Sequence, residues 1–278
     1  MSPFAFWSIV PTNDEETRRL SQLLPASTSF LSRIFRLSYF LLPPSPVPQN
    51  TLKQCLHYDP DSKACLGLRR IAKSLDKSFT ALDDLLNAQD WRGVVRVLTA
   101  SGKNNNLLGN FEEALRGNTQ PDQLLYSPTS SDSTKKAPRI PLPDPFKRSP
   151  LRQTLVRSLC KAYTNIADSS KSDLDARKNM GKWCEELLTL DGCNEDVDGL
   201  IGRAEFLLTV SGGGDDGKAW EDAARLFETA FEATGRSDRK IYQRLGKAQK
   251  MVKQSKQKDY YKIVGASRDA DERTIRKA

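Results

Sequence analysis

The feature that most constrains the fold is a helix-ending phrase that occurs three times, at residues 55–64, 187–196 and 230–239. The phrases are CLHYDPDSKA, LLTLDGCNED and AFEATGRSDR, and in each a helical stretch meets Asp-Pro or Gly before a new polar start. Proline cannot continue a helix, and glycine readily adopts the left-handed conformation that closes one. The chain is therefore predicted to be a succession of helices joined by short turns, as in helical repeat proteins.

Apolar residues recur with helical spacing before the third phrase, in AWEDAARLFETAFEATG at 219–235. Trp220, Ala223, Phe227 and Ala230 fall on one face of this predicted helix. The small residues let a neighbouring helix approach closely, and the aromatic residues fill the groove between helices. The stretch resembles the second helix of a tetratricopeptide repeat (TPR), and RAEFLL at 203–208 resembles the end of its first helix.

Two further stretches resemble second helices of TPRs. QDWRGVVRVL at 89–98 has Trp91 in the place of Trp220, although Val94 stands where alanine is usual. KWCEELLTLDG at 182–192 is the other. The resemblance implies an all-α fold, a right-handed TPR α-solenoid of about three antiparallel helix pairs followed by the beginning of a J domain. An ordinary helical bundle is the alternative.

Composition divides the chain into five parts. Residues 1–50 are of uncertain order, although FLSRIFRLSYFLLP, with Arg33 and Arg36, is typical of an amphipathic helix that lies on a membrane or packs on the solenoid. Residues 51–117 form one TPR region. Residues 118–150 hold seven prolines and many serines, which predicts a disordered insertion. Residues 151–257 form a second TPR region, with a loop at 211–217 and a C-terminal capping helix. Residues 258–278 are the fifth part.

The residue inventory argues against an enzyme and against a bound cofactor. His57 is the only histidine, and no C-x-x-C spacing occurs, so neither a histidine-based catalytic dyad nor a common metal site is expected. The net charge is +8, but the sequence contains no compact basic run with interleaved aromatic residues. A solvated helical surface is therefore favoured over nucleic-acid binding. No apolar run reaches the ~20 residues of a transmembrane helix.

Four of the five cysteines form two pairs that suit disulfides in an oxidising compartment. Cys55 lies near the end of one predicted helix and Cys65 in the first turns of the next. Cys160 and Cys184 are expected on the two facing helices of one pair. Buried free cysteines, acting as small apolar residues, are an equally acceptable interpretation.

The last residues, KQKDYYKIVGASRDADERTIRKA at 256–278, resemble the start of a J domain, whose first helix has the pattern D-Y-Y-x-x-L-G. The sequence predicts a one-turn helix that Gly265 ends and a second helix with a basic face. The resemblance implies that these residues belong to the face that docks on an ATPase chaperone: Tyr260, Tyr261, Gly265, Arg273, Arg276 and Lys277. The His-Pro-Asp turn of J domains would follow beyond Ala278, so we expect this chain to be truncated within the J domain.

Repeats, a basic helical stretch and a J-domain start, in this order, resemble the TPR and J-domain co-chaperones of the endoplasmic reticulum lumen. The resemblance implies binding of unfolded clients and their delivery to a DnaK- or BiP-type ATPase chaperone. The expected location is the lumen of the endoplasmic reticulum, with the cytoplasm as the alternative. Two other functions stay open. One is a TPR interaction scaffold or kinase regulator, and the other is a protein that binds membrane or nucleic-acid surfaces.

Overall fold

The computed structural model describes residues 28–100, 106–124, 143–170, 173–210 and 216–256, together with Arg273, and within these ranges it is helical without strands. This confirms the all-α fold class. The helices are α2 (Thr28–Phe40), α3 (Val47–Tyr58), α4 (Lys63–Asn87), α5 (Trp91–Thr99), α6 (Leu107–Asn118), α7 (Pro121–Leu124), α8 (Pro145–Arg148), α9 (Pro150–Ser169), α10 (Leu174–Leu188), α11 (Val197–Val210), α12 (Asp216–Ala233) and α13 (Arg239–Lys256).

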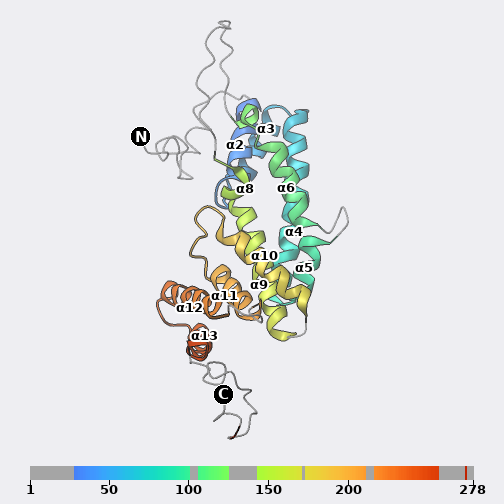
Figure 1. Cartoon of the computed structure of the whole chain (residues 1–278). Coiled ribbons are helices and arrows are strands. Elements are labelled where there is room, and N and C mark those ends of the chain that lie inside the picture. Colours follow the sequence, from blue (N-terminus) through green and yellow to red (C-terminus); the bar gives the residue numbers. More distant parts are fainter. Residues whose placement is uncertain are drawn as a thin grey trace, which may run out of the picture.

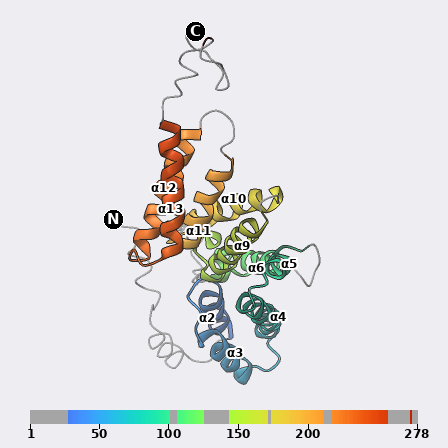
Figure 2. The same ribbon diagram turned by 90° about the horizontal axis from the view of Figure 1, so that it is seen from below.

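The helices form an elongated stack in which most elements pack on their neighbours in the sequence (Figure 1). The most extensive contacts are between α2 and α3, α9 and α10, α11 and α12, and α12 and α13. Helix α9 also packs against α5 and α6, and it thereby joins the first half of the stack to the second. Figure 2 shows α12 and α13 at one end of the molecule and α3 and α4 at the other.

The three helix-ending phrases end helices in the structure. Helix α3 ends at Tyr58, α10 at Leu188 and α12 at Ala233, each within the phrase that predicted it. The glycines that follow the second and third of these helices, Gly192 and Gly235, have φ angles of 78° and 63°. Glycine adopts such left-handed conformations without a steric penalty. Gly235 closes α12 in this way, with the amides of Gly235 and Arg236 hydrogen-bonded to the carbonyls of Glu232 and Phe231, as predicted. Gly192 instead lies in the turn beyond Thr189, which caps α10.

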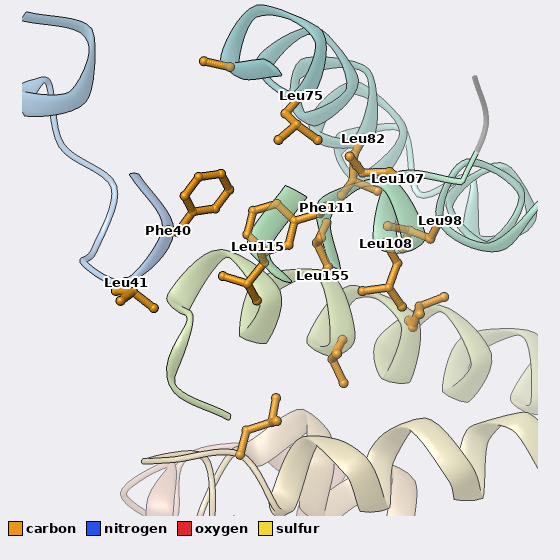
Figure 3. Close-up of a cluster of buried hydrophobic side chains, with 14 of the residues drawn as sticks. Phe40, Leu41, Leu75, Leu82, Leu98, Leu107, Leu108, Phe111, Leu115 and Leu155 are labelled. Carbon is orange, nitrogen blue, oxygen red and sulfur yellow. The ribbon is translucent and has the colours of Figure 1, made fainter. Parts of the chain in front are cut away.

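Residues 28–50, expected to be of uncertain order, belong to the folded stack. The side chains of Leu31, Phe35 and Phe40 in α2 are buried in the main core. The rings of Phe40 and Phe111 lie 5.9 Å apart, centroid to centroid (Figure 3). Of the two alternatives for this amphipathic helix, the structure shows packing on the solenoid. No helix in the described ranges is long and apolar enough to cross a membrane.

The insertion at 118–150, expected to be disordered, carries ordered structure at both ends. Helix α7 begins at Pro121 and α8 begins at Pro145, and Pro150 is the first residue of α9. Proline suits the first turn of a helix because its amide has no partner to lose there. The insertion predicted from composition, residues 118–150, was therefore too long at both ends. Residues 125–142 lie outside the described residues, as do 211–215 of the predicted 211–217 loop.

Candidate interaction surface

The residues predicted to pack the repeats lie at contacts between helices. Ala223, Phe227 and Ala230 are fully buried, and Trp220 packs from the edge against the cluster that joins α11, α12 and α13. Trp91 is half-buried against the main core, which is built from α2 to α10. These side chains hold neighbouring helices together.

Two glycines that the sequence analysis did not single out permit the tightest crossings. A Cβ atom on Gly202 of α11 would overlap the sulfur of Cys184 and lie 2.8 Å from the Thr164 hydroxyl. A Cβ atom on Gly181 of α10 would lie 2.6 Å from the ring of Phe206. Such contacts are shorter than atoms tolerate. Helix α11 therefore crosses α9 and α10 at a distance that only glycine permits.

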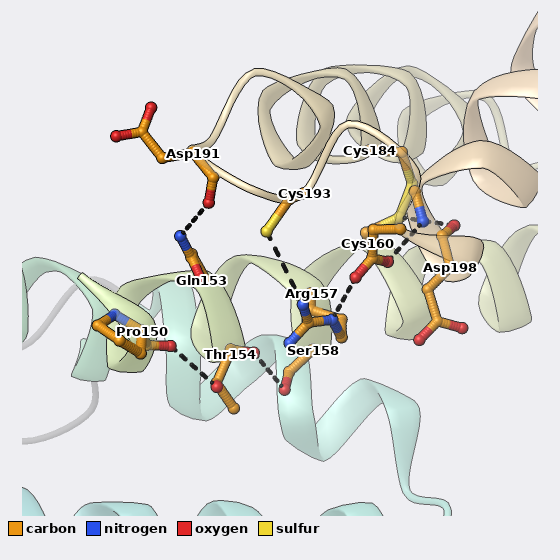
Figure 4. A network of polar contacts seen from close by, with 12 residues as sticks. Pro150, Gln153, Thr154, Arg157, Ser158, Cys160, Cys184, Asp191, Cys193 and Asp198 are labelled. Carbon is orange, nitrogen blue, oxygen red and sulfur yellow. Dashed lines mark hydrogen bonds and ion pairs between the residues drawn. A yellow bond between two sulfur atoms is a disulfide. The ribbon is translucent and has the colours of Figure 1, made fainter. Parts of the chain in front are cut away.

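Both predicted cysteine pairs are bonded in the structure. Cys55 joins the last turn of α3 to Cys65 in the first turn of α4, with a Cα–Cα distance of 6.4 Å. Cys160 joins α9 to Cys184 of α10, with a Cα–Cα distance of 4.8 Å. Cys193 is a buried free thiol near the guanidinium of Arg157, as Figure 4 shows. Burial raises the pKa of Cys193, and Arg157 opposes that rise.

Two arginines tie together helices that are distant in the sequence. Arg152 of α9 is nearly buried and forms ion pairs with Glu112 of α6 and Glu186 of α10. Arg244 of α13 pairs with Glu205 of α11, at 3.1 Å, and with Asp168 of α9, at 2.5 Å. These four ion pairs were not predicted, because the sequence spacing of the partners carries no signal of their meeting.

Two hollows open on the outside of the stack. One, of about 520 Å³, lies between α3 and α4, and the other, of about 450 Å³, lies between α12 and α13. The second hollow is lined in part by charged side chains of both helices, among them Arg225 of α12 and Lys253 of α13. No cluster of histidine, cysteine and acidic residues that could hold a metal ion occurs in the described part of the chain. The surface therefore offers shape and charge for binding, and the described residues assemble no metal centre.

Of the predicted J-domain residues, only Arg273 is described, and it is exposed. The others lie outside the described residues: Tyr260, Tyr261, Gly265, Arg276 and Lys277. Helix α13 leads up to this segment. Its exposed side carries Lys240, Lys247 and Lys250, while Ile241 and Ala248 face the neighbouring helix. The positive charge of this helix therefore lies on its exposed side.

Antiparallel helix pairs with small residues at their crossings define the chain as a helical repeat protein of the α-solenoid class. The crystal structure of the P58(IPK) TPR domain shares this fold, with a TM-score of 0.51 and 17% identity, over 88% of this chain and 52% of that one. No family model matches the chain.

Two curated relatives match most of the chain. The tetratricopeptide repeat and J domain-containing co-chaperone DNJ1 of Cryptococcus neoformans is 36% identical over 94% of this chain and 44% of its own length. The protein of that name from Mycosarcoma maydis is 33% identical over 92% and 41%. The chain is thus a homologue of the TPR and J domain-containing co-chaperones, which confirms the resemblance in its sequence. It spans less than half the length of these curated relatives.

Proposed function

We propose that this chain is the repeat-bearing part of a co-chaperone in protein folding. Its helical stack binds unfolded or partner proteins, and a form with a complete J domain delivers them to a DnaK- or BiP-type ATPase chaperone. The observation that carries the proposal is the similarity to two named co-chaperones over more than nine-tenths of the chain. The DYYKIVG motif at 259–265 adds to it, because it directly follows the last repeat helix.

The geometry supports binding rather than catalysis. Disulfides and buried ion pairs hold the helices at set angles, and a rigid scaffold loses little conformational entropy when it binds a partner. Since the relatives are named as co-chaperones, we infer a role without enzymatic activity. We also place the protein in an oxidising compartment such as the lumen of the endoplasmic reticulum, because two disulfides are typical of one.

The client-binding part is tested with heat-unfolded citrate synthase as the probe. Equimolar chain, kept without reductant, is expected to lower the light scattering of the aggregating probe. Bovine serum albumin at the same concentration is the control for crowding. Scattering that matches the albumin control would contradict client binding by the described stack.

The delivery part is tested by the rate of ATP hydrolysis by a DnaK-type chaperone in single turnover. We expect stimulation from a form of the protein with a complete J domain, and none when the histidine of its His-Pro-Asp turn is replaced by glutamine. Suppression of aggregation without any stimulation would favour the alternative, a TPR scaffold or kinase regulator that does not act on the ATPase cycle.

A further inference from the structure

The hollow between α3 and α4 is built from one stripe of side chains on each helix. Gln49, Leu52, Lys53, Leu56 and His57 follow the helical spacing on α3. Arg69, Ala72, Lys73 and Asp76 do the same on α4. Because each stripe runs along its helix, the two faces form an elongated groove. Its volume of about 520 Å³ lies within the ~300–1,000 Å³ of ordinary ligand pockets.

The groove has an apolar floor and a cationic rim. Leu52 and Ala72 are 6% exposed and form the floor, and the half-buried Leu56 adds to it. The side chains of Lys53, Arg69 and Lys73 are exposed at the rim, and none of them forms an ion pair with a described residue. The rim therefore presents positive charge that is available to a partner.

The one carboxylate in the groove is already engaged. Asp76 accepts a hydrogen bond of 2.8 Å from the phenol of Tyr39 in α2. Burial and the neighbouring Asp76 raise the pKa of Tyr39, so this phenol keeps its proton and remains a donor. Three cationic side chains in the groove, Lys53, Arg69 and Lys73, outnumber this single carboxylate, so the groove carries net positive charge at neutral pH.

The walls of the groove are held at a fixed angle. The Cys55–Cys65 disulfide closes one end by joining α3 to α4. Tyr39 stacks on the buried Phe35, at 5.2 Å between ring centroids, and so ties the Asp76 end to α2. Figure 2 shows the three helices side by side. A binding site that is already formed needs little rearrangement when it is occupied.

We propose that the α3–α4 groove binds a short acidic segment of a partner protein, with an apolar side chain on the floor and flanking carboxylates paired with Lys53, Arg69 and Lys73. Charge complementarity selects this occupant. A bilayer surface fits less well, because the apolar floor is recessed between the helices. The inference rests on the proposed function only in treating the stack as a protein-binding scaffold, and it names the chemistry of one partner.

The test measures fluorescence anisotropy of a labelled twelve-residue peptide in which one leucine is flanked by aspartate and glutamate, with the whole chain in 50 mM salt. We expect binding that weakens as salt rises to 300 mM. A peptide with lysine in place of the acidic residues is expected not to bind. A peptide with serine in place of the leucine is expected to bind about tenfold more weakly.

Charge-reversal variants test whether the peptide binds in the groove. Lys53→Glu and Lys73→Glu are each expected to weaken binding about 3- to 10-fold. Lys178→Glu makes the same charge change at an exposed position of α10 and is expected to leave affinity unchanged. Circular dichroism checks that each variant is folded, and Lys53→Ala and Lys73→Ala replace any that is not.

Several results would overturn the proposal. They are no binding of the acidic peptide, equal binding of the lysine peptide, or equal loss of affinity in the Lys178→Glu control. Binding of single-stranded RNA or of vesicles with 30% phosphatidylserine, without binding of the peptide, would also overturn it. Peptide binding does not need the J domain, so it can fail while suppression of aggregation and ATPase stimulation succeed, and the reverse.

Discussion

At the scale of single residues, charged side chains buried among the helices affect the stability of the fold. Arg152 is the clearest case, because its guanidinium lies among α6, α8, α9 and α10. Burial lowers the pKa of Arg152, but the hydrogen bonds to Glu186 and Glu112 outweigh burial and leave the pKa raised. Arg152 therefore stays charged, and its removal would leave two carboxylates without their partner.

Arg152→Met is expected to destabilise the protein by about 2–4 kcal/mol, since removing one partner of a buried ion pair leaves uncompensated charge. The measurement is urea unfolding followed by circular dichroism. Arg203→Met is the matched control. Its pair with Glu185 is more exposed, so its loss is expected to cost less than about 1 kcal/mol. Equal costs for the two variants would show that the Arg152 pairs are not special.

Asp198, in the first turn of α11, predicts a dependence of stability on pH. Burial raises its pKa above the ordinary 3.8, Lys161 lowers it and Asp196 raises it further. The folded state therefore binds this proton more tightly than the unfolded state. The free energy of unfolding accordingly gains a contribution as pH falls through the raised pKa, and loses it at neutral pH.

Asp198→Asn removes this titration. We expect the variant to be more stable than the natural chain at pH 7, and we expect the difference to shrink as pH falls towards 3.8. Urea unfolding at a series of pH values between these limits gives the comparison. A difference that is the same at every pH would mean that the Asp198 carboxylate does not titrate as its burial implies.

At the scale of helices, contacts between elements depend on the space at each crossing. Gly202→Ala forces a Cβ atom against Cys184 and Thr164, and overpacking of this kind costs about 1–3 kcal/mol. Gly246→Ala is the matched control in α13, where an added Cβ meets nothing within 4 Å. It is expected to stabilise the helix by about 0.5–1 kcal/mol. Thermal unfolding would contradict this prediction if both variants moved the midpoint in the same direction.

Phe227 is the central side chain of the cluster that joins α11, α12 and α13. Phe227→Ala is expected to cost about 3–5 kcal/mol, as the loss of a fully buried aromatic side chain does. Phe231→Ala, at a half-buried position of the same helix, is expected to cost less than about 2 kcal/mol. Hydrogen exchange is expected to locate the change in α11–α13, because stacked repeats mainly contact their neighbours. Uniformly faster exchange would contradict a local effect.

At the scale of the whole molecule, the two disulfides close loops of 10 and 24 residues in sequence separation. Loop-closure entropy then stabilises the folded chain by about 2.5–3.5 kcal/mol for each bond. Alkylation in denaturant is expected to add one label without reductant, on Cys193, and five labels after reduction. Five labels without reductant would mean that the cysteines are free, the alternative that the sequence leaves open.

The sequence predicted the helices and their ends well, because both depend on local chemistry. Asp59-Pro60 and Gly235 end their helices through local backbone chemistry, and the spacing of Trp220, Ala223 and Phe227 shows which face is buried. The resemblance to co-chaperones was also predictable, since the motif of a J-domain start needs only contiguous residues. Residues 28–50 and the ends of the proline-rich insertion were judged less well, because composition does not say which neighbours a segment will meet.

By itself, therefore, the sequence determined an all-α repeat fold and its kinship with co-chaperones. Only the tertiary structure decided which distant residues meet. Arg152 lies 40 residues from Glu112 and 34 from Glu186, and the groove between α3 and α4 exists because of the angle at which those helices pack. Such contacts arise from the packing of whole helices, which fixes positions that no local run of residues specifies.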